Sequence, residues 1–343
     1  MNPAHLPRTV ARALRCAVEE GELGVSVPGR VVVERSRPGG VGEYATPVAF
    51  GVAKAAGMKP AEVAQVLARR LAVEPGVRSV EVTGGGFLNF VLEPRPVAEL
   101  VREVQALGPR YGWSVDAAGE AAPGVESLQS PHQSPQSPHQ APQAPQQWGG
   151  GREGVVREAV RRILFSQGCD QEPGEIKVAG LARRDHDLVR RLGAEAARWG
   201  MLAGPARQAP VLDGSLARLD ESNPFFRVQY GYARSRALVR NAGQLGFRAE
   251  PGPLEGDAEA LVRVLAEYPL VLEAAAHHRE ADRLARHLVL IADALLDFQY
   301  CVLTTGDEKP LAAHRARLAL AEAAGTVLAG GLALLGIEAS DRI

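Results

Sequence analysis

The apolar positions of this chain follow two patterns, one on each side of a polar tract. Before the tract, short stretches with helical and extended periodicity alternate over residues 1–113. After it, apolar residues recur every three or four positions nearly throughout, which is typical of amphipathic helices. The clearest stripe has spacings of 4, 3, 4 and 3 and consists of Leu284, Leu288, Ile291, Leu295 and Phe298. The pattern predicts an α+β N-terminal module followed by an all-α helical bundle.

Within the N-terminal module, the local signals predict seven elements. A proline at position 60 favours a helix start there, because proline is tolerated in the first helical turn. The glycines at 84–86 lie between two apolar, β-rich runs and predict a hairpin. We expect helices over 6–20, 43–57, 60–72 and 95–107, and strands over 30–35, 77–82 and 87–92.

The polar tract over residues 127–148 is rich in Pro, Gln, Ser and His and offers almost nothing to bury. Such a composition cannot offset the entropy lost on ordering, so we expect a disordered linker over 114–150. Twenty-two residues of extended Pro-rich chain reach about 70 Å, at roughly 3.1 Å each. The two histidines in it, His132 and His139, fit a solvated linker better than a metal site.

Charge and cysteine content narrow the class of protein. The net charge of −1 favours neither a nucleic acid nor a membrane surface as the binding partner. Lysine occurs at four positions only, so nearly every cation is an arginine; this bias fits phosphate and base recognition, or merely a GC-rich genome. The isolated Cys16, Cys169 and Cys301 support neither disulfides nor zinc. The apolar stretch 326–337 is too short to cross a bilayer. We expect a soluble, cytoplasmic protein without membrane contact.

One segment, residues 223–248, contains five arginines interleaved with aromatic residues and no carboxylate. This composition is typical of surfaces that contact phosphates and stack on unpaired bases. An equally simple interpretation divides the residues by face, with the aromatic rings packed inward and the arginines solvated. The pattern alone leaves both open.

The same segment resembles the start of the anticodon-binding helical bundle of arginyl-tRNA synthetases. It reads SNPFFRVQYGYARSRALVRNA, where the family has Asn-Pro and then Val-Gln-Tyr-Ala-His-Ala-Arg. The resemblance extends over residues 187–343. It implies a DALR-type anticodon-binding bundle that contacts tRNA, most simply tRNA(Arg). The residues that we expect to make this contact are Arg227, Tyr230, Tyr232, Arg234, Arg236 and Tyr300.

The N-terminal module resembles the same family independently. VGEYATPVAFGVAKAAG is similar to the family's Gly-Asp-Tyr-Ala-Thr-Asn segment, and GGGFLNFVL to its Gly-Phe-Ile-Asn-Phe strand. The resemblance implies that Phe87 stacks on a D-loop base and that Asn89 hydrogen-bonds its edge. Strand alternation places both side chains on one face, about 6 to 7 Å apart. The alternative is an asparagine satisfied by neighbouring backbone.

The family's catalytic domain has no counterpart of sufficient length between the two modules. Residues 151–186 resemble a remnant helix of that domain, and Gly149, Gly150 and Gly151 stand where catalytic histidines are expected. A triglycine can also form an anion-binding nest, although a flexible joint is the simpler interpretation. Four residues depart from the family's motifs, which puts anticodon identity in doubt: Pro47, Tyr232, Val302 and Ile343.

These observations favour a non-catalytic tRNA-binding protein with no cofactor and no metal. It would grip tRNA at the D-loop and the anticodon, as an adaptor for a partner enzyme that modifies or uses tRNA. Two alternatives stay open. One is residual arginine-tRNA ligase or ATP-dependent activity, and the other is a protein-interaction scaffold that has lost RNA binding.

Overall fold

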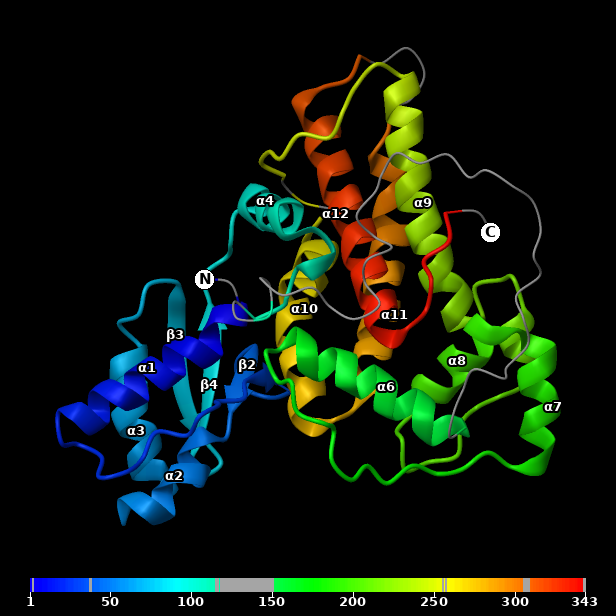
Figure 1. Ribbon diagram of the computed structural model, residues 1–343. Helices are drawn as coiled ribbons and strands as arrows, with labels where there is room; N and C mark the ends of the chain where they lie inside the picture. The colour runs from blue at the N-terminus through cyan, green and yellow to red at the C-terminus, as the bar shows by residue number, and fades with distance from the viewer. Residues whose placement is uncertain are drawn as a thin grey trace. The chain divides into compact units, whose positions relative to one another are not determined.

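A computed structural model (Figure 1) describes residues 1, 3–36, 39–114, 117, 151–254, 256, 258–304 and 309–341. The linker expected over 114–150 therefore lies outside the described residues, except for Ser114 and Ala117. The chain divides into two compact units. Unit 1 comprises Met1–Pro96 with Pro269–Ala274, and unit 2 comprises Val97–Tyr268 with Ala275–Ile343.

Unit 1 is a small α+β fold built on one antiparallel sheet with the strand order β1-β2-β4-β3. The central strand β4 pairs with β3 through the expected glycine hairpin, so that Thr83 faces Phe87 and Glu81 faces Asn89. On its other edge β4 pairs with β2. The elements are η1 (Pro3–His5), α1 (Leu6–Glu19), β1 (Glu34–Arg35), β2 (Tyr44–Thr46), α2 (Val48–Ala56), α3 (Pro60–Leu71), β3 (Val77–Thr83) and β4 (Phe87–Leu92).

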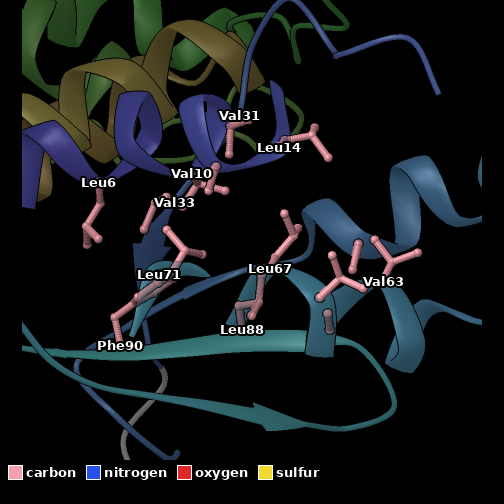
Figure 2. Packing of buried hydrophobic residues seen from close by; sticks show 14 of the residues in the cluster. Leu6, Val10, Leu14, Val31, Val33, Val63, Leu67, Leu71, Leu88 and Phe90 are labelled. Carbon is pink, nitrogen blue, oxygen red and sulfur yellow. The ribbon is translucent and has the colours of Figure 1, made fainter. Parts of the chain in front are cut away.

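The core of unit 1 lies between the sheet and the helices α1 and α3 (Figure 2). Leu88 and Phe90 point from β4 into it and are fully buried, because alternation places them on the same face of the strand. Leu67 and Leu71 of α3 are buried in the same cluster. Each such side chain stabilises the fold by roughly 1.5 to 3 kcal/mol relative to an exposed one.

Two expected boundaries in unit 1 differ from the structure. The helix expected over 43–57 begins only at Val48, because Tyr44–Thr46 pairs with β4 as a strand. The Thr46 hydroxyl also donates to the Val32 carbonyl (2.7 Å), which ties this strand to the preceding segment. The strand expected over 30–35 is regular only at Glu34–Arg35. At the first place, backbone pairing with β4 overrides the local helical signal. At the second, only Glu34 and Arg35 find a strand partner, in β2.

Among the described residues of unit 2, the regular elements are all helices, as expected for the C-terminal part of the chain. Its first helix, α4, belongs with the bundle, although the sequence grouped it with the module over 1–113. The elements are α4 (Val97–Leu107), η2 (Gly108–Arg110), α6 (Gly151–Ser166), α7 (Arg183–Leu192), α8 (Ala194–Leu202), η4 (Gly214–Ala217), α9 (Pro224–Gln244), α10 (Glu259–His278), α11 (Ala281–Phe298), η5 (Gln299–Cys301) and α12 (Ala312–Leu335).

Three long helices, α9, α11 and α12, run beside one another and form the centre of the bundle (Figure 1). The predicted stripe of α11 is fully or almost fully buried, from Leu284 at 0% exposed to Phe298 at 4%. Small residues allow the close approach, since a Cβ on Gly231 of α9 would lie 3.2 Å from the Ala292 Cβ of α11. Helix α12 is long and apolar enough to cross a membrane, but 78% of its most apolar window is buried inside the protein, as in the core helix of a bundle.

Candidate nucleic-acid interface

The residue at which helix α9 begins decides in which direction its arginines and aromatic residues point. Asn223 caps the helix: its side-chain oxygen accepts from the Phe225 amide (3.0 Å) and its amide group donates to the Leu216 (3.0 Å) and Arg218 (2.9 Å) carbonyls. Pro224 then occupies the first turn, where its missing N–H costs nothing. The Asn-Pro of the sequence motif is therefore a helix start that fixes every following side chain.

One face of α9 carries Arg227, Tyr230 and Arg234, at spacings that place them on adjacent turns. Both arginines reach α11 or its end: Arg227 lies 3.3 Å from the Asp293 carboxylate, and Arg234 Nε donates to the Gln299 side-chain oxygen. Tyr300, the residue after Gln299, is 81% exposed. The structure thus places three of the six bundle residues on one face of α9, and the exposed Tyr300 follows the residue that Arg234 contacts. We call these four residues the α9–α11 surface: Arg227, Tyr230, Arg234 and Tyr300.

The other two predicted residues lie on a different face. Tyr232, Arg236 and Arg240 are spaced by four and point toward the C-terminal segment and α12. Arg240 lies 3.6 Å from the Asp341 carboxylate. Burial raises the pKa of Glu322 on α12, and the positive charge of Arg236 lowers it. Burial raises the pKa of the Tyr232 hydroxyl. Tyr232 and Arg236 are therefore separated from the α9–α11 surface by the body of the helix.

The aromatic residues of this segment are divided between core and surface. Phe225 packs against Trp199, with ring centroids 5.5 Å apart, and Phe247 is 4% exposed. Tyr230 instead stacks on Phe226, with centroids 5.6 Å apart and planes 11° apart, and remains 40% exposed. The inward-packing interpretation holds for the first two rings, whereas the stacked pair offers a flat aromatic surface beside two arginines.

Residues 223–248 contain no carboxylate, but carboxylates from other elements lie close to their arginines. Burial raises the pKa of Asp293, while Arg227 lowers it and Asp297 raises it further. Asp293 on α11 thus partly neutralises Arg227. Arg234 differs, because its side-chain partner is the uncharged Gln299, and among the described residues no carboxylate lies within ion-pair distance of it. Arg234 is half-buried and keeps a positive charge that no described carboxylate neutralises.

In unit 1, Phe87 and Asn89 share a face of β4 but differ in exposure. Phe87 is 41% exposed and packs on Phe50 of α2, with ring centroids 5.0 Å apart. Asn89 is 7% exposed, and its amide donates to the Thr83 hydroxyl (2.7 Å) and the Glu81 carbonyl (3.3 Å). The structure therefore shows that much of the Asn89 side chain is satisfied within the sheet, as in the structural alternative.

The loop before β2 closes over Asn89. Gly42 has φ +71°, and a Cβ there would lie 3.3 Å from the Asn89 Cβ and 2.9 Å from the Phe90 carbonyl oxygen. Only glycine accommodates this backbone and this approach. Phe50, 41% exposed, was not predicted as part of the site. Phe50 follows an apolar run in the sequence, so no local signal distinguishes it from a core residue.

Residues 93–227, which connect the two modules, contain only helices and loops where the structure describes them. All strands of the described residues lie in 34–92. A nucleotide-binding α/β domain requires a parallel sheet covered by helices, and the described part of this segment has none. Within the described part of the chain, no group of three His, Cys, Asp or Glu side chains is placed to hold a metal ion.

Comparisons with known proteins identify both modules. The family described as "Arginyl tRNA synthetase N terminal domain" matches residues 6–92, and the family described as "DALR anticodon binding domain" matches residues 228–343. An arginine-tRNA ligase of Frankia alni is 46% identical over 119 residues, which are 35% of this chain and 22% of that relative. This chain therefore matches less than a quarter of the relative's length.

The fold agrees with these matches. The arginyl-tRNA synthetase of Thermus thermophilus aligns over 100% of both chains with a TM-score of 0.53 and 15% identity. At this identity the likeness concerns the fold. The two family matches occur in the order and on the units where the sequence motifs predicted them, and together they confirm the resemblance. The chain carries an arginyl-tRNA synthetase N-terminal domain over residues 6–92 and a DALR anticodon-binding domain over residues 228–343, and over both it resembles the arginyl-tRNA synthetases.

Proposed function

We propose that this protein binds tRNA without aminoacylating it, and that it presents tRNA(Arg) to a partner enzyme. The observation that carries the proposal is the α9–α11 surface, on which two arginines and two exposed tyrosines meet within the anticodon-binding domain. Arginine forks contact phosphates, and tyrosine faces stack on unpaired bases. An anticodon loop offers both, since its bases are unpaired and its backbone is charged.

Within this surface the residues have different roles. Arg234, held by Gln299 with its charge uncompensated, contacts a phosphate. Tyr300, exposed and next in the chain, stacks on a base, and Tyr230 offers a second stacking face. Each stacked base contributes about 1 to 3 kcal/mol. Tyr232 and Arg236 lie on the other face of α9 and contribute less, through long-range charge.

Unit 1 supplies a second contact in this proposal. Phe87 and Phe50 form an exposed aromatic pair on which a D-loop base stacks. Asn89 supports this pair from within the sheet, because its amide is bound to Thr83 directly opposite Phe87. Its side-chain oxygen accepts no hydrogen bond from the described residues and is the atom through which it reads a base edge. Two contacts on one tRNA raise the overall affinity through effective concentration.

The absence of aminoacylation is proposed from chemistry. Adenylation requires positioned donors around the α-phosphate, an electrostatic contribution that dominates such catalysis. The described residues between the two modules form helices with no nucleotide-binding sheet. A separate enzyme therefore supplies the chemistry, in the cytoplasm where tRNA is used.

The test is binding to purified total tRNA at low salt, followed by sequencing of the retained RNA. Enrichment of tRNA(Arg), with affinity that falls steeply as salt rises, supports the proposal. Arg234→Ala and Tyr300→Ala each weaken binding, by about tenfold for a lost stacking or phosphate contact. The matched control is Arg315→Ala, an exposed arginine at the start of α12.

Two outcomes would favour the alternatives. Retention of no tRNA at low ionic strength supports the interaction scaffold. Arginine-dependent exchange between ATP and pyrophosphate by the purified chain shows residual ligase chemistry.

A further inference from the structure

A cavity of about 550 Å³ lies in unit 2, at the junction of α10 and α11. Its lining includes three cations from three different segments: Lys177, Arg207 and Arg279. His278 lines it as well, and the two carboxylates are Glu175 and Glu280. Glu280 is bound to Arg283 (2.7 Å), which lowers its pKa and offsets its charge. The cavity therefore presents an excess of positive charge.

The wall that carries Arg207 is held by a buried arginine. Arg152 of α6 is 2% exposed and has no carboxylate partner among the residues that the structure describes; its guanidinium donates to backbone carbonyls. A buried guanidinium is costly unless its donors are satisfied, and here five carbonyls satisfy them. The acceptors are the carbonyls of Met201 (3.2 Å), Ala179 (2.9 Å), Ala206 (3.2 Å), Pro205 (3.3 Å) and Gln208.

These bonds join the two segments that supply Lys177 and Arg207. The Ala179 amide donates to the Ala206 carbonyl (2.8 Å), and Arg152 binds the carbonyls of both residues. Segments 175–179 and 205–208 are otherwise irregular, so this network sets their separation. The two cations are therefore presented from a preorganised wall, which reduces the entropy lost on binding a ligand.

The third cation stands at an unusual backbone position. Arg279 caps α10 with φ 56° and ψ 41°, and it is the one non-glycine residue with positive φ among those the structure describes. Glycine is favoured at this helix position, and a side chain costs about 1 kcal/mol there. A cation that lines a basic cavity at an energetic cost to the backbone is typical of a functional site.

We infer that this cavity binds a phosphate group. Arginine and lysine side chains on three sides, with a cavity in the size range of small-ligand sites, suit a compact multivalent anion. The site is separate from the α9–α11 surface, since it lies at the start of α11, whereas Arg227 meets α11 at Asp293, about 18 Å further along the helix. The phosphate comes from a small phosphorylated molecule or from the tRNA backbone; the second source rests on the proposed function.

Inorganic pyrophosphate is the probe, and calorimetric titration of the full chain at low salt is the measurement. We expect saturable binding that weakens at least tenfold in the double variant Lys177→Ala/Arg207→Ala. Arg279→Gly also weakens binding, yet leaves the thermal midpoint unchanged or higher, because glycine suits the left-handed cap. Arg315→Ala, the exposed arginine control, binds like the parent.

A second measurement, of tRNA binding, distinguishes the two sources of the phosphate group. If pyrophosphate competes with tRNA and the double variant weakens both, the phosphate belongs to RNA. If tRNA binding is absent or unaffected while pyrophosphate binding depends on the three cations, the ligand is a small molecule, even where the proposed function fails. The inference is overturned if no pyrophosphate binds and tRNA affinity is unchanged in the double variant. It is equally overturned if all variants, the control included, weaken alike.

Discussion

Ser235 of α9 faces Gly325 of α12 so closely that a Cβ on the glycine would lie 2.8 Å from the serine Cβ. Ser235 is 1% exposed, and its hydroxyl donates to the Ala321 carbonyl (2.9 Å). The hydrogen bond fixes the serine rotamer and leaves no room for a methyl group opposite. Helices α9 and α12 therefore approach each other closely at this pair of small residues.

Gly325→Ala should lower the free energy of unfolding by about 1 to 3 kcal/mol, because overpacking forces the two helices apart. Urea denaturation measures the change. The matched control is Gly243→Ala near the end of α9, where nothing lies within 4 Å of the added Cβ. There the substitution should stabilise by roughly 0.5 to 1 kcal/mol. Equal effects at the two glycines would contradict the close contact.

Replacement of Arg152 should destabilise unit 2 more than any exposed arginine. Arg152→Met removes the guanidinium donors from five backbone carbonyls, of which Ala206 and Pro205 keep a backbone donor; each carbonyl left without a donor and out of reach of water costs roughly 1 to 3 kcal/mol. Arg152→Lys restores the charge but not the planar fork, so it should recover only part of the loss. Thermal unfolding checks both. Arg157→Met, on the exposed side of the same helix, serves as control and should change the midpoint little.

Asn89 and Thr83 should be energetically coupled in unit 1. Their side chains share a 2.7 Å hydrogen bond across the hairpin. A double-mutant cycle with Asn89→Ala and Thr83→Val should give a coupling free energy of about 1 kcal/mol. Phe87→Ala is the comparison: its exposed ring should affect tRNA retention more than stability. Additive effects of the first two changes would show that the hydrogen bond contributes nothing.

Asp293→Asn should tighten tRNA binding roughly two- to five-fold, because it removes the carboxylate that partly neutralises Arg227. The comparison is Asp341→Asn, which frees Arg240 on the opposite face of α9. Filter binding over a series of salt concentrations measures both. If Asp341→Asn has the larger effect, the RNA contacts the Tyr232 face instead of the α9–α11 surface.

The same carboxylate predicts a pH effect on stability. Burial raises the pKa of Asp293 in the folded chain above its ordinary value of 3.8, so the folded state holds this proton more tightly than the unfolded state. The contribution of this group to stability therefore falls as pH rises from about 3.8 through its folded pKa. Asp293→Asn should remove that part of the pH dependence. Urea unfolding midpoints at several pH values in this range provide the check.

Much of the fold was readable from local patterns. The stripe of α11 and the hairpin of β3 and β4 were predicted because helical and strand periods are properties of neighbouring residues. The start of α9 is also set locally, by the Asn223 cap and Pro224, although no helix boundary was predicted there. The family motifs then assigned both modules, and the matches over 6–92 and 228–343 agree.

The site depended on contacts between distant segments. Residues 223–248 contain no carboxylate, yet the fold brings Asp293 and Asp341 to their arginines. Five of the six predicted residues of the bundle are divided between two faces of α9, and the sixth, Tyr300, lies in η5. The basic cavity has no sequence signature, since Lys177, Arg207 and Arg279 are far apart in the chain.

The sequence by itself determined the periodicity of the helices, the caps and the family motifs, because these depend on residues a few positions apart. Tertiary structure alone decided which charges are neutralised, how deeply Asn89 is buried and where the cations gather. The physical reason is that electrostatic and packing energies fall off with distance in space, and helix packing sets those distances between segments that the sequence leaves far apart.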